Sequence, residues 1–329
     1  MKNLLTRLIN QEILSKDESK KVLIDISKGE FSDSQIAAFL TVFMMRSVSI
    51  EELEGFRDGL LELCLPIDLN DFNLVDLCGT GGDGKDTFNI STLASFITAG
   101  AGVQVAKHGN YGVSSNCGSS NVMEFLGVKF YNRQDLLKRS IEKAGICFLH
   151  AAHFHPAMKK VAPIRKTLAV KTFFNMLGPM VNPAFPKNQV VGVFSLELAR
   201  IYGYLYQKTA LNFSILHSLD GYDEISLTGD TKIISNRTEG LLTPQDFGFQ
   251  KIDPTAISGG NSVESAAKIF MNILNGEGTE AQNNVVCANA GMAISTVKNI
   301  SLLEGFEQAK EALLSKKALS ALKKLQELN

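Results

Sequence analysis

Apolar residues over the first 66 positions recur at helical spacing. Ser32 and Gln35 have the spacing of a capping box, in which two side chains close the first turn of a helix, and apolar residues on one helical face follow them. A second capping box precedes the segment IEELEGFRDGLLELC, and Pro66 with the polar segment IDLNDFN ends the helical pattern. We predict a small all-helical N-terminal domain over residues 1–68.

The pattern changes at Leu74, where short apolar runs begin to alternate with helical stretches. The runs typical of buried strands are LVDLC (74–78), VQVAK (103–107), CFLHA (147–151), QVVGVFS (189–195) and FSILHSL (213–219). Between and after them lie helical patterns such as STLASFITAGAG, RQDLLKRSIEKA and LELARIYGYLYQKT, and a further helix begins near Ser262. This alternation predicts an α/β domain over residues 69–329, with a mostly parallel central sheet flanked by helices.

The segment TFFNMLGPMVNPAFP (172–186) fits neither pattern. It is apolar, yet it carries two asparagines and three prolines. We predict a buried connector and expect the chain to return to the helical domain near residues 166–185.

Composition and charge narrow the class of protein. The chain has 329 residues, of which 45% are hydrophobic and 20% charged, and its formal net charge is −1. That charge balance argues against a nucleic-acid partner and against attraction to an anionic membrane. The five cysteines are odd in number and lack CxxC spacing, which favours a reduced cytoplasmic protein without disulfides or a zinc cluster. The N-terminus is not typical of a signal peptide, and the most apolar stretch, 93–106, is too short to span a bilayer.

A glycine-rich loop follows the first predicted strand in DLCGTGGDGKDTFNIST (76–92). Glycine permits close backbone approach to a ligand, and a strand, a glycine loop and a helix N-terminus together present free N–H groups to an anion. Hydroxyl and amide side chains follow at Thr80, Thr87, Asn89, Ser91 and Thr92. The spacing is neither that of a dinucleotide-binding motif nor that of a Walker A loop. Phosphate binding is favoured over a tight turn without a ligand.

A second glycine-rich loop, KHGNYGVSSNCGSS (107–120), follows the next strand. Ligands of open α/β sheets bind outside the carboxyl ends of the strands, so two such loops on adjacent strands would surround one anionic ligand. Lys107 would then contact a phosphate oxygen. Taken alone, Lys107 would be a solvated surface lysine and His108 a packed ring.

Acidic residues follow a later strand in LHSLDGYDEIS. Asp223 and Glu224 could converge in a loop and hold Mg²⁺ beside a diphosphate, with Asp83 and Asp86 as further oxygen donors. Without the glycine loops, the pair would be a solvated turn. Arg165 precedes the apolar connector and could bind a carboxylate with two parallel hydrogen bonds, although such a basic run is more often a solvated helix face.

Together these stretches resemble the anthranilate phosphoribosyltransferase family. The matching motifs are GTGGD at 79–83, NIST at 89–92, KHGN at 107–110, HPAM at 155–158, Arg165, FNMLGPMVNPA at 174–184 and DGYDE at 220–224. They occur in the family's order, and GEFSDSQIAAFL also fits, so the resemblance covers nearly the whole chain.

The resemblance implies transfer of the 5-phosphoribosyl group of phosphoribosyl pyrophosphate (PRPP) to the amine of anthranilate, in tryptophan biosynthesis. It implies Mg²⁺ as cofactor, a hinge between the two domains, and a homodimer formed through the helical domain. No Ser–His or Cys–His constellation stands out in the sequence, so no covalent intermediate is required, and we expect Lys107 and Mg²⁺ to stabilise the transition state. Domain closure would exclude water that could hydrolyse PRPP.

Site residues follow from the same resemblance, position by position. The residues expected to bind PRPP are Gly79, Gly82, Asp83, Thr87, Asn89, Ile90, Ser91, Thr92, Lys107 and Ser119. Those expected to bind anthranilate are Gly79, Asn110, His155 and Arg165, and those expected to bind Mg²⁺ are Ser91, Asp223 and Glu224.

The sequence departs from the common family pattern in three places. Tyr111 stands where the family usually has Arg, and Asn116 and Cys117 stand in a stretch that often carries Lys. Lys171 begins the segment that often reads RTxFN in the family. Two positive charges are absent from the second loop. Whether the 5-phosphate is held by fewer side chains or by more backbone N–H groups stays open.

Three alternatives to this function remain. Pyrimidine nucleoside phosphorylases are similar in architecture, but they use inorganic phosphate and need no paired carboxylates. A nucleic-acid-binding relative would require a basic stripe, and no strong cluster stands out beyond KKVAPIRK. A related transferase could use a different aromatic amine or base as the acceptor.

Overall fold

The computed structural model describes residues 1–112 and 117–328, and the chain divides into two compact units. Unit 1 comprises Met1–Pro66 and Ala151–Pro183, and unit 2 comprises Ile67–His150 and Ala184–Asn329. The stretch after residue 150 therefore belongs to the same unit as the N-terminal helices.

Unit 1 is helical throughout its described residues. Its elements are α1 (Lys2–Ile9), α2 (Lys16–Lys28), α3 (Asp33–Met45), α4 (Ile50–Leu63), α8 (Ala151–Phe154), α9 (Met158–Leu168) and the 3-10 helices η1 (Phe173–Met176) and η2 (Gly178–Val181). The capping boxes predicted before α3 and α4 are present, because Ser32 and Ser49 accept hydrogen bonds from the backbone three residues on. The helical pattern read from the N-terminal sequence is confirmed.

Phenylalanine rings form the centre of unit 1. Phe39 and Phe43 of α3, Phe56 of α4 and Phe173 of η1 meet edge to face or stacked, and the Phe56 and Phe173 ring centroids are 4.2 Å apart. Aromatic pairs of this kind contribute about 0.5–1.5 kcal/mol each beyond their buried area. Phe173 thus ties the later segment of unit 1 to its N-terminal helices.

Unit 2 contains the sheet, which has seven strands in the described residues. The strands are β1 (Val75–Gly79), β2 (Val105–Gly109), β3 (Ile146–His150), β4 (Asn188–Gly192), β5 (Asn212–Ser218), β6 (Thr231–Ser235) and β7 (Glu239–Leu242). Their order is β3-β2-β1-β4-β5-β6-β7; the first five are parallel and the last two antiparallel. The predicted mostly parallel sheet is confirmed, and the antiparallel extension by β6 and β7 was not predicted.

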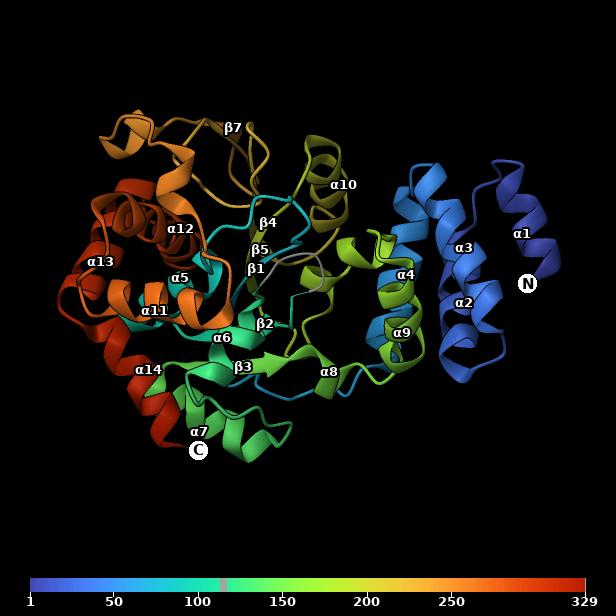
Figure 1. Ribbon diagram of the computed structural model, residues 1–329, viewed down its shortest axis with the longest axis horizontal. Coiled ribbons are helices and arrows are strands. Elements are labelled where there is room, and N and C mark those ends of the chain that lie inside the picture. The colour runs from blue at the N-terminus through green and yellow to red at the C-terminus, as the bar shows by residue number, and fades with distance from the viewer. Residues whose placement is uncertain (113–116, 329) are drawn as a thin grey trace. The chain divides into compact units, whose positions relative to one another are not determined.

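Helices flank this sheet. They are α5 (Ile90–Gly100), α6 (Ser119–Phe125), α7 (Gln134–Ala144), α10 (Leu196–Tyr206), α11 (Val263–Leu274), α12 (Glu280–Lys298), α13 (Leu302–Leu314), α14 (Lys317–Glu327) and the 3-10 helices η3 (Pro244–Phe247) and η4 (Pro254–Ile257). α5 and α12 pack against each other and on the central strands, while α10 packs on β5 and β6 from the other side (Figure 1).

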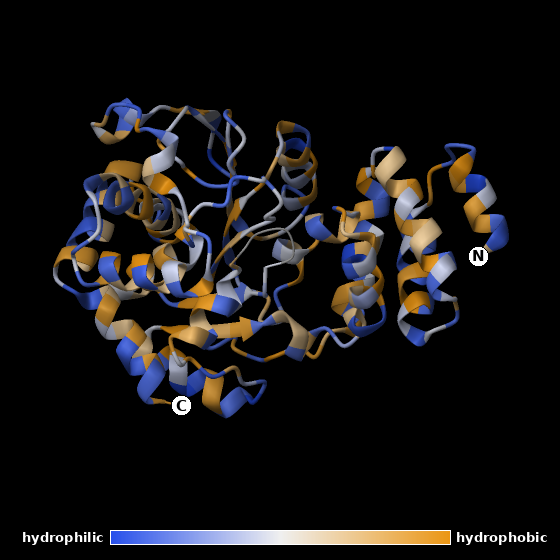
Figure 2. Cartoon of the chain, viewed as in Figure 1, coloured by the Kyte–Doolittle hydropathy of each residue, from blue (hydrophilic) through white to orange (hydrophobic). Residues whose placement is uncertain are grey.

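The burial of α5 and α12 explains their composition. Both helices carry buried residues over most of their length, so they lack a broad polar face, whereas α7 and α14 show separate polar and apolar sides (Figure 2). Among the described residues, no single helix is long and apolar enough to cross a bilayer. Within the part of the chain that the structure describes, only α12 and α13 taken together meet the length and composition for a span, and they are bent by 119° at their junction.

Candidate active site

The loops that follow β1 and β2 leave the same edge of the sheet. β1 ends at Gly79 and β2 ends at Gly109, and the two strands are parallel neighbours. β4 lies on the other side of β1, and β5 lies next to β4. The carboxyl ends of neighbouring parallel strands share one edge, where ligands of such sheets bind. The expectation that the two glycine loops follow adjacent strands is confirmed.

Asp223 lies in the space that side chains at two glycines would occupy. Gly79 and Gly192 are directly opposite each other in the register of β1 and β4. A Cβ at Gly79 would lie 2.4 Å from Asp223 Oδ2, and a Cβ at Gly192 would lie 1.5 Å from the Asp223 carbonyl oxygen. Only glycine permits such close approach. The loop after β5 can therefore close over the ends of β1 and β4.

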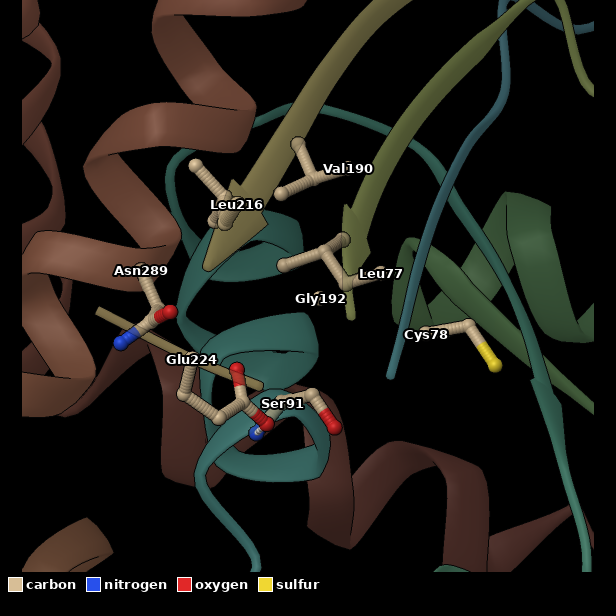
Figure 3. A pocket seen from close by; sticks show the side chains of 8 residues that line it. All are labelled: Leu77, Cys78, Ser91, Val190, Gly192, Leu216, Glu224 and Asn289. Atoms are coloured by element: carbon tan, nitrogen blue, oxygen red, sulfur yellow. Dashed lines mark hydrogen bonds between the residues drawn. The ribbon is translucent and has the colours of Figure 1, made fainter. Parts of the chain in front are cut away.

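Two acidic side chains bind the backbone of the first glycine loop. The N–H of Gly81 donates to Asp223 Oδ2 at 2.7 Å, and the N–H of Ser91 donates to Glu224 Oε1 at 3.2 Å. Figure 3 shows the Glu224 carboxylate beside the Ser91 side chain, where both line a small cavity of about 10 Å³. The interpretation of these acids as a solvated turn is therefore wrong, because Asp223 binds the β1–α5 loop and Glu224 binds the first turn of α5.

The carboxylates crowd one another. Burial raises the pKa of Asp223, and the nearby Asp83 carboxylate raises it further. Burial also raises the pKa of Glu224, with Asp223 adding to the rise and Lys107 opposing it. Buried like charges of this kind favour the neutral form unless an opposite charge joins them. A divalent cation would supply that charge.

The donor set suits Mg²⁺ held by few protein ligands. Asp and Glu oxygens are hard ligands, and Mg²⁺ in phosphate sites usually keeps several waters and uses one or two carboxylates. Among residues 1–112 and 117–328, no group of three or more His, Cys, Asp or Glu is placed to hold a metal ion. Asp223 and Glu224 would therefore leave most of the coordination to substrate oxygens and water.

Lys107 is buried in the middle of β2 and is only 2% exposed, so its interpretation as a solvated surface lysine is wrong. Its Nζ donates to the His108 carbonyl oxygen at 3.3 Å. The N–H of His108 donates to Oδ1 of Asp76, a fully buried residue of β1, at 3.0 Å. This bond fixes the end of β2 against β1. A buried ammonium with three donors is a strong partner for a phosphate oxygen.

The N-terminus of α5 lies directly after the first loop. Asn89 is the N-cap residue, but its side chain does not cap the helix; its Nδ2 donates to the carbonyl oxygen of Cys117 at 3.1 Å. Ile90, Ser91 and Thr92 form the first turn. The partial positive charge at the start of this eleven-residue helix therefore points to the same loop that the acids bind.

The remaining residues of the first loop are held by local contacts. Gly82 has φ of +76°, in the left-handed region that favours glycine. Asp83 Oδ1 accepts a hydrogen bond from the N–H of Lys85 at 3.1 Å. Thr87 forms an isolated antiparallel bridge with Ser258. These contacts fix the path between β1 and α5.

Asn110 and Ser119 meet in the second loop. Ser119 Oγ donates to the Asn110 carbonyl oxygen at 3.3 Å, and the N–H of Ser120 donates to the same oxygen at 3.1 Å. Gly109 leaves room for this contact, because a Cβ there would lie 2.4 Å from Ser119 Oγ. The start of α6 is thereby tied to the end of β2.

The three departures from the family pattern have different surroundings. The Tyr111 hydroxyl donates to the Glu124 carboxylate at 3.2 Å, and its ring lies 4.8 Å from the His150 ring. Asn116 lies outside the described residues. Lys171 is exposed in unit 1. Tyr111 thus brings a neutral side chain that already has an acidic partner.

Two further predicted site residues lie in unit 1. His155 is buried, and its burial lowers its pKa to about 4, so the ring is neutral at pH 7. Arg165 of α9 donates from Nη2 to Asn175 Oδ1 at 3.1 Å, and its guanidinium carbon lies 5.5 Å from the centroid of the Phe174 ring. Burial lowers the pKa of Arg165 from its ordinary value. The guanidinium is therefore oriented by Asn175, as a residue that binds a planar anion would need.

Three residues that support the site were not predicted. Gly192 makes room for Asp223, Asp76 fixes β2, and Asn289 of α12 binds both the N–H and the carbonyl of Ile225, next to Glu224. Asp76 and Asn289 each stand alone in an apolar segment. A buried polar residue almost always has a hydrogen-bond partner. A single polar residue within an apolar segment was therefore the signal available in the sequence.

Fold and site together define a class of glycosyltransferase with a helical domain and an α/β domain. The family described as "Glycosyl transferase family, helical bundle domain" matches residues 2–64, and "Glycosyl transferase family, a/b domain" matches residues 71–319.

Full-length relatives narrow this class. The anthranilate phosphoribosyltransferase of Flavobacterium psychrophilum is 68% identical over 329 residues, covering 100% of both chains. The crystal structure of the Thermus thermophilus enzyme of that name has a TM-score of 0.91 at 33% identity and covers 98% of each chain. A Saccharomyces cerevisiae structure of the same name, in complex with PRPP and Mg, has a TM-score of 0.89 and covers 98% of this chain and 96% of that one. At 24% identity, this match shows a likeness of fold. The chain belongs to the anthranilate phosphoribosyltransferase family.

Proposed function

We propose that the chain carries out the reaction of its family with PRPP and Mg²⁺ held at the carboxyl ends of β1, β2 and β5. The reaction transfers the 5-phosphoribosyl group of PRPP to the amine of anthranilate and releases pyrophosphate. Its product, N-(5-phosphoribosyl)anthranilate, belongs to tryptophan biosynthesis. The observation that carries the proposal is the contact of Asp223 and Glu224 with the first glycine loop.

The two glycine loops would bind PRPP. Backbone N–H groups of a glycine loop and of a helix N-terminus are suited to phosphate oxygens. The residues assigned to this role are Gly79, Gly82, Asp83, Thr87, Asn89, Ile90, Ser91, Thr92, Lys107 and Ser119. Lys107 supplies the buried positive charge of the set. With Tyr111 bonded to Glu124, we assign more of the phosphate contacts to backbone N–H groups and fewer to basic side chains.

Ser91, Asp223 and Glu224 would hold Mg²⁺. The raised pKa values of the two acids reflect their burial and the neighbouring carboxylates, and a bound cation would offset both effects. When bound, the ion neutralises negative charge that develops on the departing pyrophosphate. Asp223 and Glu224 also hold the loop amides of Gly81 and Ser91 in place, which orients the loop for the substrate.

Gly79, Asn110, His155 and Arg165 would bind anthranilate. The Arg165 guanidinium, oriented by Asn175, suits the planar carboxylate. Neutral His155 brings no charge at pH 7 and would contact the acceptor through its ring. Gly79, at the end of β1, would lie near the amine.

Chemistry at this site needs positioning more than activation. The amine of anthranilate is a weak base and is mostly unprotonated near neutral pH, so no strong general base is required. We assign no covalent nucleophile; the carbon–oxygen bond to pyrophosphate breaks as the amine attacks the anomeric carbon. Lys107 and the loop amides would stabilise the negative charge on the leaving group. Alignment of the two substrates supplies the rest of the rate.

We further propose that the chain forms a homodimer through unit 1 and acts in the cytoplasm. Several large apolar side chains of unit 1 are exposed, among them Ile9, Ile13, Met44 and Met45, the last at 81%. Such a concentration of exposed apolar residues is typical of an interaction surface. Light scattering coupled to size exclusion tests the dimer, and charge substitutions at Ile13 and Met45 should yield monomers.

A fluorescence assay tests the function. Purified protein is mixed with anthranilate, PRPP and Mg²⁺, and the loss of anthranilate fluorescence is followed. We expect consumption that requires both PRPP and Mg²⁺ and stops in EDTA. Phosphorolysis of uridine or thymidine in place of anthranilate consumption would contradict the proposal and favour a nucleoside phosphorylase.

A further inference from the structure

A second cavity lies in unit 2 at the amino end of β5. Its volume is about 240 Å³, and its walls come from the start of β5, the end of β6, the turn to β7, the second half of α12 and the segment that leads into α13. Asp223 and Glu224 follow the opposite end of β5, which at about 3.3 Å per residue is roughly 20 Å away. The cavity is therefore separate from the proposed substrate site.

The walls of this cavity are largely apolar. The apolar lining residues are Phe213, Ile233, Leu242, Met292, Ile300 and Leu302. Most of the lining hydroxyls already have protein partners: Ser214 bonds Thr296 at 2.9 Å, and Ser295 donates to the Ile300 carbonyl oxygen at 2.7 Å. A ligand with an apolar body would gain binding free energy from contact with these walls, and it would not need to form hydrogen bonds with these hydroxyls.

Arg237 provides a positive charge among the lining residues. It is exposed, and Nη2 donates to the Thr296 carbonyl oxygen at 3.4 Å. Within the described parts of the chain, Arg237 has no acidic partner within 4.0 Å, and the acid two residues on, Glu239, pairs with Lys232 at 2.7 Å. A guanidinium has five donors in a planar fork that matches a carboxylate. Most of those donors are available for a ligand.

We propose that this cavity is a second ligand site, which binds a small carboxylic acid with a single-ring body. The ring would lie among the apolar side chains and the carboxylate would bind Arg237. Size supports this choice, because an apolar cavity of about 150 Å³ accepts benzene. A volume of about 240 Å³ leaves room for a substituted ring.

Helix α12 connects the cavity with the loop that carries Glu224. Met292, Ser295 and Thr296 line the cavity, and Asn289, one turn before Met292, bonds the N–H of Ile225 at 3.0 Å and its carbonyl at 2.9 Å. A ligand that shifts α12 would shift the backbone beside Glu224. We therefore infer that occupancy of the cavity changes the apparent affinity for PRPP and Mg²⁺. This second part rests on the proposed function.

Crystals soaked with 4-iodobenzoate test the location. We expect an anomalous iodine peak among Phe213, Ile233 and Met292, whether or not a second peak occurs where anthranilate binds. The absence of iodine from the cavity would overturn the proposal, and this result does not depend on transferase activity.

Calorimetric titration tests the role of charge. With anthranilate at saturation, we expect Arg237→Gln to weaken binding of 4-iodobenzoate at least tenfold and Arg237→Lys to weaken it less. Thr238→Trp, at an exposed lining position, should block the cavity and abolish binding. The neutral 4-iodobenzyl alcohol should bind at least tenfold more weakly to the unaltered protein. Equal affinity in Arg237→Gln would contradict the carboxylate assignment.

Kinetics test the connection through α12. At saturating anthranilate, 4-iodobenzoate should change the KM for PRPP at least twofold in the unaltered enzyme. Arg237→Gln and Thr238→Trp should retain normal activity without the probe and lose the response to it. An unchanged KM while the cavity is occupied would overturn the connection. An enzyme inactive without the probe would instead contradict the proposed function, and the binding results would stand.

Discussion

Asp223 Oδ2 lies only 2.4 Å from where a Cβ at Gly79 would be, so the loop after β5 packs directly on the end of β1. The same carboxylate oxygen accepts a hydrogen bond from Gly81 at 2.7 Å. The Asp223 carboxylate fits here only because Gly79 has no side chain, and its hydrogen bond with Gly81 orients the glycine loop. The proposed Mg²⁺ and PRPP sites are parts of a single structure.

Gly79→Ala should therefore disrupt the site. The added methyl must displace the Asp223 carboxylate, and errors of about 1 Å in substrate positioning lower rates about 100-fold. We expect kcat/KM to fall at least 100-fold while the protein stays folded by circular dichroism. Gly240→Ala in β7 is the control, since nothing lies within 4 Å of a Cβ there. Near-normal activity of Gly79→Ala would argue against the packing described here.

Asp223→Asn and Glu224→Gln should weaken dependence on Mg²⁺. Each change removes one negative oxygen donor from the proposed ion, so activation should require at least tenfold more Mg²⁺. The measurement is initial rate against Mg²⁺ concentration. Asp220→Asn in the same loop is the matched control and should leave the curve unchanged. Superimposable curves for all three variants would refute the metal role.

Arg165→Ala should raise the KM for anthranilate at least tenfold, with a smaller effect on the KM for PRPP. A charge-assisted bidentate bond contributes to binding of the acceptor, and its loss appears mainly in KM. Lys166→Ala, its exposed neighbour on α9, serves as control. If the KM for anthranilate is the same in both variants, Arg165 does not bind the carboxylate.

His155 should make unfolding depend on pH. Its pKa is about 4 in the folded protein because of burial, against about 6.5 when exposed, so protons bind the unfolded chain more readily. The contribution of His155 to the free energy of unfolding should be complete above pH 6.5. It should be lost as the pH falls toward 4, which lowers the free energy of unfolding by at most about 3 kcal/mol. Urea unfolding at pH 7 and 4.5 measures it.

In that experiment, His155→Gln should lose less stability between pH 7 and 4.5 than the unaltered protein. His153→Gln, at an exposed position on α8, should behave like the unaltered protein. An identical pH dependence for all three proteins would show that His155 does not contribute.

Local signals made much of the fold predictable. The capping boxes at Ser32 and Ser49 involve residues three positions apart, so the sequence alone specifies them. The parallel strands followed from apolar runs between helices. β6 and β7 are short, and β7 is half-exposed at the edge of the sheet. The pairing of β5 with β6 and of β6 with β7 depends on tertiary contacts that no local pattern reports.

The site was predictable only in its motifs. Glycine loops and acidic pairs can be recognised in the sequence. The contact of Asp223 with Gly192, however, joins residues 31 positions apart through the packing of β4. Lys107 was open to two interpretations because burial depends on what the fold places around it. The supporting contacts of Asp76 and Asn289 also depend on the packing of distant segments.

A crystal structure with PRPP and Mg²⁺ tests the central claim most directly. We predict the diphosphate against Gly79–Asp83 and the N-terminus of α5, with Lys107 on a phosphate oxygen and Mg²⁺ on Asp223 and Glu224. PRPP bound elsewhere, or bound with the ion away from these two acids, would contradict the site proposed here.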